Sequence, residues 1–302
     1  MKIRNVLATI IVVLIFYFLI ANLIKNWQNI PFDSLHFSVV NVVLSFIFLF
    51  VNFFLFIQGW KSIVNALGEK VGFKSAFWII SSSQIAKYVP GGIWFALGRV
   101  YLGKIEKIKG EIIALSVIIE TGLTFLVGIL LFFISISLVE QKLFAQFIFI
   151  VPIFFLFLII LYPPILNRLM NFALRIIKKP TINLNISYKQ LLQLSIYFFG
   201  LWIAQIIGFY FLINAIYTIS FSKIFILAAA YTLSWMTGFV VIFAPGGLGV
   251  REGMMTLLLS TILPTPLAIA ISFIARVWIT VFEIVVFFIG LSVKRSMQSD
   301  KE

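Results

Sequence analysis

The sequence predicts an all-α, polytopic membrane protein. Its 302 residues are 62% hydrophobic and only 11% charged, with 35 phenylalanines and a mean hydropathy of +1.15. A soluble protein of this composition would have too little polar surface to cover itself. The sequence also lacks the recurring segments of alternating hydrophobicity that an outer-membrane barrel requires, so helices are the expected spanning elements.

Apolar runs of bilayer-spanning length divide the chain into about six full transmembrane helices. The first run, 6–24, follows Lys2 and Arg4 and is too long for a typical signal-peptide core, so we expect an uncleaved helix there. The other full spans are expected at 38–59, 111–138, 143–164, 190–214 and 266–291. We expect residues 1–302 to form a single integral membrane domain.

Two further apolar regions, 75–103 and 222–263, are each interrupted by Pro-Gly-Gly. The breaks consist of Pro90, Gly91 and Gly92 in the first region, and of Pro245, Gly246 and Gly247 in the second. Proline removes a backbone donor and glycine permits positive φ, so each break ends one helix and begins another. The unpaired N–H groups of the new helix attract anions, especially phosphate. Gly-Gly also serves close helix packing, so a purely architectural role of either break stays open.

The basic residues predict how the spans are oriented. With a cytoplasmic N-terminus, the loops near 60–74, 99–110 and 165–189 and both termini hold most of the 23 lysines and arginines. The net charge of +13 then reflects topology and contact with anionic headgroups, and no nucleic-acid partner is expected.

This topology makes the two interrupted regions enter the membrane from opposite faces, as broken hairpins. Hairpins of this kind are typical of an inverted-topology repeat. The candidate repeat halves are 38–164 and 190–291, with 1–30 as an extra N-terminal helix. The short arms of the first hairpin favour a re-entrant form, whereas one arm of the second is long enough to span.

Several charged residues lie inside apolar segments, where a charge costs several kcal/mol unless it is paired or hydrated. Glu120 has no basic residue within a helical turn, so we expect it either to be protonated or to have a partner from another segment, with Lys87 and Arg251 as the candidates. Salt bridges that serve only stability are the alternative to a functional site. The candidate headgroup-binding residues are Lys87, Pro90, Gly91, Gly92, Arg99, Glu120, Pro245, Gly246, Gly247, Gly249, Arg251, Glu252, Arg276 and Glu283.

The sequence offers little for cofactor or metal chemistry. It contains no cysteine, and its one histidine, His36, is expected in a loop as a solvated side chain. No Gly-x-x-x-x-Gly-Lys-Ser/Thr motif is present, so ATP is not expected as a direct energy source. We expect no metal, no cofactor and no catalytic residue.

Two motifs carry a resemblance to a known family. The first is Gln84-x-x-Lys87-Tyr88-Val89-Pro90-Gly91-Gly92-Ile93-Trp94 followed by Gly98-Arg99, and the second is Pro245-Gly246-Gly247-Leu248-Gly249-Val250-Arg251-Glu252. The chain resembles, over nearly its whole length, the lysylphosphatidylglycerol synthase transmembrane-region family, also called the flippase-like domain family. It is similar to the membrane flippase domain of the multiple peptide resistance factor, without the soluble synthase domain. Arg276 falls where the family shows an arginine, and Glu120 falls in a Glu-Arg-x-x-Asp pattern whose arginine and aspartate this sequence lacks.

The resemblance implies a flippase-like protein of the prokaryotic cytoplasmic membrane, and the distribution of basic residues predicts that both termini are cytoplasmic. It would bind and translocate, or scramble, a phosphate-headgroup lipid, either a membrane phospholipid or a polyprenyl-phosphate-linked lipid. The chain ends at Glu302 without an aminoacyl-transferase domain, so lipid aminoacylation by this chain alone is not expected. The alternative is a membrane component of a polyprenyl-phosphate glycosyltransferase or envelope-glycolipid synthesis system. A separate envelope-synthesis enzyme as partner, and an oligomeric state, both stay open.

Overall fold

A computed structural model describes residues 17, 21, 24, 28, 32–89, 92–139, 145, 147–176, 181, 186–241 and 244–299. The described residues are almost entirely helical and contain no β-strand, which confirms the predicted all-α class. The expected first helix at 6–24 lies almost wholly outside the described residues, as does the extra segment 1–30.

Five described helical segments are long and apolar enough to cross a membrane. They are α2 (Val39–Ala66), α5 (Gly110–Val139), α9 (Tyr188–Asn214), the continuous stretch Phe221–Val240 that contains α10 (Ile224–Val240), and α12 (Thr265–Ser299). Four of these overlap the expected full spans, and α10 forms the first arm of the second broken region. The protein is therefore a multi-pass membrane protein by the length and composition of its helices.

The expected span 143–164 corresponds to two helices with a sharp bend between them. Helix α7 (Val151–Leu161) is followed by the single residue Tyr162, and α8 (Pro163–Ile176) begins directly after it. The axes of the two helices differ in direction by 77°. Tyr162 has ψ of 120°, because a residue before proline is forced out of the helical region. The pair counts as a sixth span if both helices are taken together.

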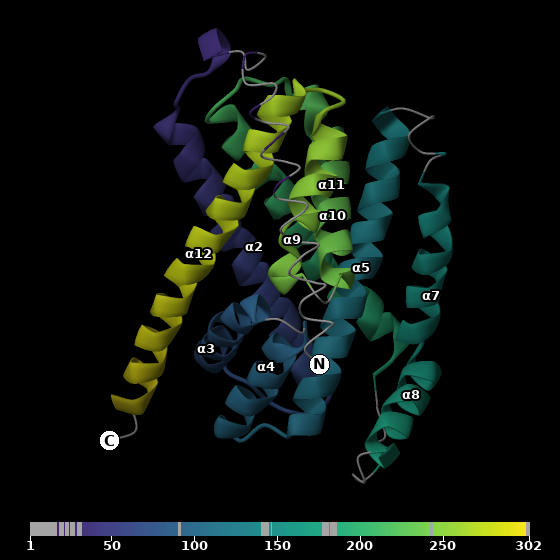
Figure 1. The fold of residues 1–302 in the computed structure, drawn as a ribbon. Helices are drawn as coiled ribbons and strands as arrows, with labels where there is room; N and C mark the ends of the chain where they lie inside the picture. The colour runs from purple at the N-terminus through teal and green to yellow at the C-terminus, as the bar shows by residue number, and fades with distance from the viewer. Residues whose placement is uncertain are drawn as a thin grey trace.

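Two pairs of helices lie on either side of the Pro-Gly-Gly breaks. The first pair consists of α3 (Phe73–Gln84) with the short η3 (Ile85–Tyr88), and α4 (Trp94–Ile105). The second pair consists of α10 and α11 (Val250–Leu259), joined through η6 (Pro245–Gly247). Figure 1 shows α3 and α4 in the half of the molecule where α12 ends, and α10 and α11 in the opposite half. Since η3 contacts η6, the two breaks meet between the halves.

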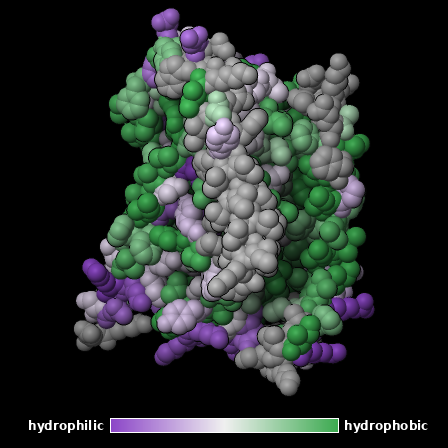
Figure 2. Space-filling view, in the orientation of Figure 1, coloured by the Kyte–Doolittle hydropathy of each residue, from purple (hydrophilic) through white to green (hydrophobic). Residues whose placement is uncertain are grey.

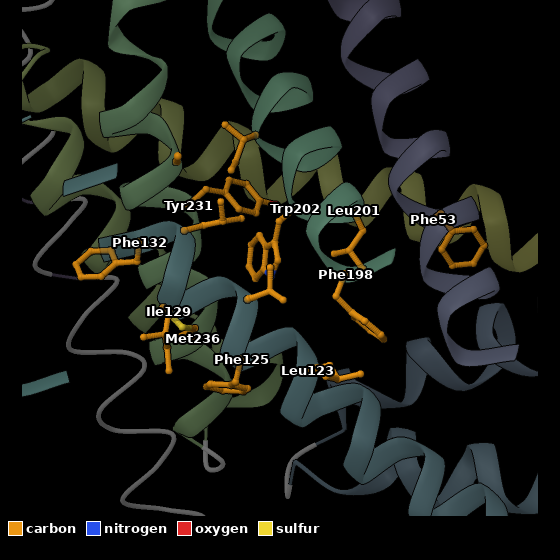
Figure 3. Packing of buried hydrophobic residues seen from close by; sticks show 14 of the residues in the cluster. Phe53, Leu123, Phe125, Ile129, Phe132, Phe198, Leu201, Trp202, Tyr231 and Met236 are labelled. Atoms are coloured by element: carbon orange, nitrogen blue, oxygen red, sulfur yellow. The ribbon is translucent and has the colours of Figure 1, made fainter. Parts of the chain in front are cut away.

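Buried aromatic and aliphatic side chains fill the space between α5, α9 and α10 (Figure 3). Trp202 on α9 is fixed there by its indole N–H, which donates to the Thr124 carbonyl on α5 at 3.0 Å. Its ring meets Trp235 of α10 edge to face, with the ring centroids 5.5 Å apart. Van der Waals packing of this kind holds helices together in a membrane, where lipid removes the hydrophobic driving force.

Close helix packing at Gly290 gives a first prediction, on stability. A Cβ at this position of α12 would collide with the Ser81 hydroxyl of α3 and lie 3.1 Å from Ser81 Cβ. We expect Gly290→Val to lower the free energy of unfolding by about 1–3 kcal/mol through overpacking. The control is Gly253→Ala in α11, where a Cβ meets nothing within 4 Å. Titration with SDS in mixed micelles measures both variants, and equal stability of the two would contradict this packing.

Candidate functional site

A cavity of about 190 Å³ lies where the two breaks meet. Its walls come from both helix pairs and from α2, α5, α9 and α12. The cavity-lining residues that the sequence predicted are Lys87, Gly92, Glu120, Gly246, Gly247, Arg251 and Glu283. Residues from the two halves of the chain therefore share one hollow, which is the arrangement expected of a ligand site between helices.

The second break has the conformation that its glycines permit. Gly246 and Gly247 have φ of 59° and 74°, a region that side-chain-bearing residues rarely adopt. A Cβ on Gly247 would also lie only 2.8 Å from both the Gly238 carbonyl oxygen and Arg251 Nε. The glycine thus allows the break, α10 and Arg251 to lie in direct contact.

The first turn of α11 is capped from within the protein. Gly249 precedes the helix with φ of 81°, and its N–H donates to Glu252 Oε2 at 2.6 Å. The Gly246 carbonyl accepts a hydrogen bond from Arg276 Nη1 at 2.8 Å. The sequence predicted that the N–H groups at the start of this helix would be available to an anion. The Gly249 N–H is instead hydrogen-bonded to the Glu252 carboxylate.

The first break is tied to α12 by two side chains of η3. Lys87 forms an ion pair with Glu283, and the Tyr88 hydroxyl donates to the same carboxylate at 2.8 Å. The Tyr88 hydroxyl also lies 3.1 Å from Thr280 Oγ1. Pro90 and Gly91 lie outside the described residues. These contacts fix η3 beside the cavity, with Lys87 and Glu283 both on its wall.

The predicted ion pair of Glu120 with Lys87 or Arg251 was wrong. Glu120 pairs with Arg99, rather than with Lys87 or Arg251. Helices α4 and α5 follow each other in the chain and pack together, which brings Arg99 to Glu120 across a short turn. The Arg99 side chain is fully buried and lies 5.6 Å from the ring centroids of both Phe56 and Trp60. Glu120 therefore lines the cavity, whereas Arg99 contacts Glu120 from outside it.

A third ion pair joins α11 to α12. Arg276 Nε lies 3.8 Å from Glu252 Oε1, and its guanidinium carbon is 5.4 Å from the Tyr88 ring centroid. Arg276 thus contacts both breaks, through Gly246 and through Tyr88. A second, smaller cavity of about 20 Å³ lies beside this pair.

Arg251 differs from the other central cations because it has no carboxylate partner among the described residues. Its Nε is buried without a hydrogen bond in this part of the chain, and its guanidinium carbon lies 5.9 Å from the Trp235 ring centroid. Arg251 also lines the larger cavity. We define the central charge cluster as Lys87, Arg99, Glu120, Arg251, Glu252, Arg276 and Glu283. The cluster contains four cations and three carboxylates, so it has one positive charge in excess.

Uncharged polar residues that the sequence analysis did not single out complete the wall. Gln205 of α9 donates from Nε2 to the Tyr231 hydroxyl of α10 at 3.0 Å, and both side chains are buried. Asn52 of α2 and Thr121 of α5 also line the cavity. In the sequence these residues appear only as an amide or a phenol inside an apolar run. Such a residue can line a site or can hydrogen-bond between packed helices, and polarity alone does not distinguish the two.

The helices and this cavity define a multi-pass membrane protein with a charged, partly aromatic candidate site between two broken helix pairs. Residues 5–286 match the family described as lysylphosphatidylglycerol synthase TM region. The chain belongs to this family, which confirms the resemblance carried by the two Pro-Gly-Gly motifs. No curated protein and no solved structure matches the chain significantly.

Proposed function

We propose that the protein binds the headgroup of a phosphate-bearing lipid in the central cavity and translocates or scrambles that lipid across the membrane. The observation that carries the proposal is Arg251, a cavity-lining guanidinium without a carboxylate partner among the described residues. Membership of the lysylphosphatidylglycerol synthase TM region family supports a role in lipid chemistry.

The excess positive charge of the central charge cluster favours a ligand that carries a negative charge. A buried charge needs a counter-charge, because the low dielectric of a membrane interior makes an unpaired ion costly. A phosphate supplies one negative charge and several acceptor oxygens, and the planar guanidinium of arginine suits them well. The phosphate therefore completes the central charge cluster, with Lys87 nearby on the same wall.

The arrangement of the two helix pairs supports an inverted pair of hairpins that hold the headgroup between them. Each pair comes from one end of the molecule and brings its break to the cavity (Figure 1). Hydrophilic residues gather at the lower end of the molecule, around the end of α12 and the connection from α4 to α5, as Figure 2 shows. Lys104, Lys107, Lys109, Lys294 and Arg295 belong to these segments. By the positive-inside rule this end faces the cytoplasm, and a prokaryotic cytoplasmic membrane is the proposed location.

Reconstituted vesicles test the proposal. Head-labelled phospholipids and polyprenyl-phosphate lipids are incorporated, and a membrane-impermeant quencher reports the fraction of each label in the outer leaflet over time. We expect the protein to accelerate the exchange of at least one phosphate lipid between leaflets. Exchange no faster than in protein-free vesicles for every lipid would overturn the proposal.

Gly238→Ala tests whether the position of Arg251 matters, with the charge left unchanged. A Cβ on Gly238 would collide with the Arg251 side chain and lie 2.7 Å from its Nε. Gly238 lies in the last turn of α10 and does not have a positive φ, so the substitution acts on Arg251 rather than on the backbone. We expect the vesicle exchange rate to fall by roughly tenfold, equal to about 1.4 kcal/mol. Gly253→Ala serves as the control, and an unchanged rate in Gly238→Ala would separate transport from the position of Arg251.

A further inference from the structure

The two carboxylates that line the cavity are already engaged by the protein's own cations. Glu120 pairs with the fully buried Arg99, and Glu283 pairs with Lys87 while it accepts a second hydrogen bond from Tyr88. A charged amine in a ligand needs a carboxylate whose charge is not already offset, or an aromatic face, because a cation away from water is costly without a counter-charge. Among the described cavity residues, the charge of each carboxylate is therefore already offset by a cation of the protein.

Aromatic faces beside the charges are occupied in the same way. Arg251 lies over Trp235 with its guanidinium carbon 5.9 Å from the ring centroid. Lys87 and Arg276 lie over Tyr88 at 5.3 and 5.4 Å. A ligand ammonium at the Trp235 face would have to displace Arg251, and elsewhere near Arg251 it would be repelled by that cation in a medium of low dielectric.

The polar groups that the cavity does offer are neutral. The Gln205 amide uses its Nε2 to donate to Tyr231, which leaves its Oε1 as an acceptor and the Tyr231 hydroxyl hydrogen as a donor. Asn52 donates from Nδ2 to the Leu201 carbonyl at 2.8 Å, which leaves its Oδ1 as an acceptor. Amides and hydroxyls that both donate and accept match the hydroxyl groups of a polyol or a sugar.

We propose that the cavity selects a phosphate ester whose headgroup is uncharged and hydroxylated over one that carries an amine. The proposal rests on the proposed function, because it takes the phosphate to lie at Arg251. The neutral acceptors of Gln205 and Asn52 would then meet the hydroxyl groups on the other side of the phosphate. Two lipid sources share this chemistry, a glycerol-headed phospholipid and a hexose linked to a polyprenyl phosphate.

Competitive binding to the purified full chain tests this selectivity separately from transport. The protein in detergent is mixed with equimolar phosphatidylglycerol, phosphatidylethanolamine, N-acetylated phosphatidylethanolamine and polyprenyl-phosphate hexose, and native mass spectrometry counts the bound lipids. Acetylation removes the charge of the amine and leaves the phosphate in place. We expect the three lipids without an amine to bind about tenfold or more above phosphatidylethanolamine, in line with the cost of a like charge beside a partly buried cation.

Gln205→Glu supplies the matched change in the cavity. It adds a carboxylate of nearly the same shape beside Tyr231, where it would offset the charge of Arg251 and provide a free partner for an amine. We expect the preference to shift by roughly tenfold toward phosphatidylethanolamine. The control Gln193→Glu makes the same chemical change on an exposed face of α9, and we expect it to leave the selectivity as in wild type.

The outcomes separate the two proposals. Binding that depends on Arg251 but favours phosphatidylethanolamine, or treats it equally, would overturn the selectivity and leave the phosphate site intact. Binding of no phosphate lipid above the level of Arg251→Ala would overturn both. Selectivity that shifts in Gln205→Glu and not in Gln193→Glu would support both, and the ratio of phosphatidylglycerol to polyprenyl-phosphate hexose would identify the source.

Discussion

Arg251→Ala is expected to reduce the exchange of the transported lipid between leaflets by roughly tenfold to hundredfold, because a hydrogen bond to a charged group contributes about 1.5–3 kcal/mol. The effect is large because Arg251 is the cation of the central charge cluster that no described carboxylate neutralises. Its removal balances the cluster and takes away the reason for an anion to enter. The vesicle assay measures this directly, with the same lipid that the wild type exchanges fastest.

Two further variants define what the arginine contributes. Arg251→Lys keeps the charge but loses the planar set of donors, so we expect an intermediate rate. Arg175→Ala removes an exposed arginine from α8, away from the cavity, and serves as the matched control for lost positive charge. A rate in Arg251→Ala that equals the rate in Arg175→Ala would remove Arg251 from the mechanism.

The sequence predicted the helices well because hydropathy over some twenty residues is a strong and local signal. It also located both breaks, because Pro-Gly-Gly acts on the backbone at its own position. The bend at Tyr162 was missed, although Pro163 and Pro164 mark it, because the apolar run continues through them.

The pairing of the charges was harder to predict, because partners in a helix bundle depend on which faces meet. Glu120 was expected to reach Lys87 or Arg251, and the structure instead pairs it with Arg99 from the neighbouring α4. Two helices joined by a short turn pack side by side, so residues about twenty positions apart can come into contact. The prediction did not take into account that the turn between α4 and α5 brings Arg99 to Glu120. This pairing changed the interpretation of the site, since it leaves Arg251 without a carboxylate partner among the described residues.

The same pairing predicts the largest effect on stability. Arg99→Met leaves Glu120 buried without its partner, and we expect a loss of about 3–5 kcal/mol in the free energy of unfolding. The Arg99 side chain is fully buried and that of Glu120 is only 6% exposed, so bulk solvent screens the remaining carboxylate poorly. Titration with SDS in mixed micelles measures the loss, as for the glycine variants.

The double variant Arg99→Met with Glu120→Leu distinguishes an unpaired charge from a general loss of packing. Replacing both ions by apolar side chains removes the uncompensated carboxylate, so the double variant should be more stable than Arg99→Met alone. The exposed pair Lys109–Glu69, with Nζ and Oε1 3.3 Å apart and the lysine side chain 75% exposed, provides the comparison. There Lys109→Met should cost no more than about 1 kcal/mol, because solvent screens the remaining charge. If the double variant proved no more stable than Arg99→Met, the loss would come from packing around Phe56 and Trp60 rather than from the buried carboxylate.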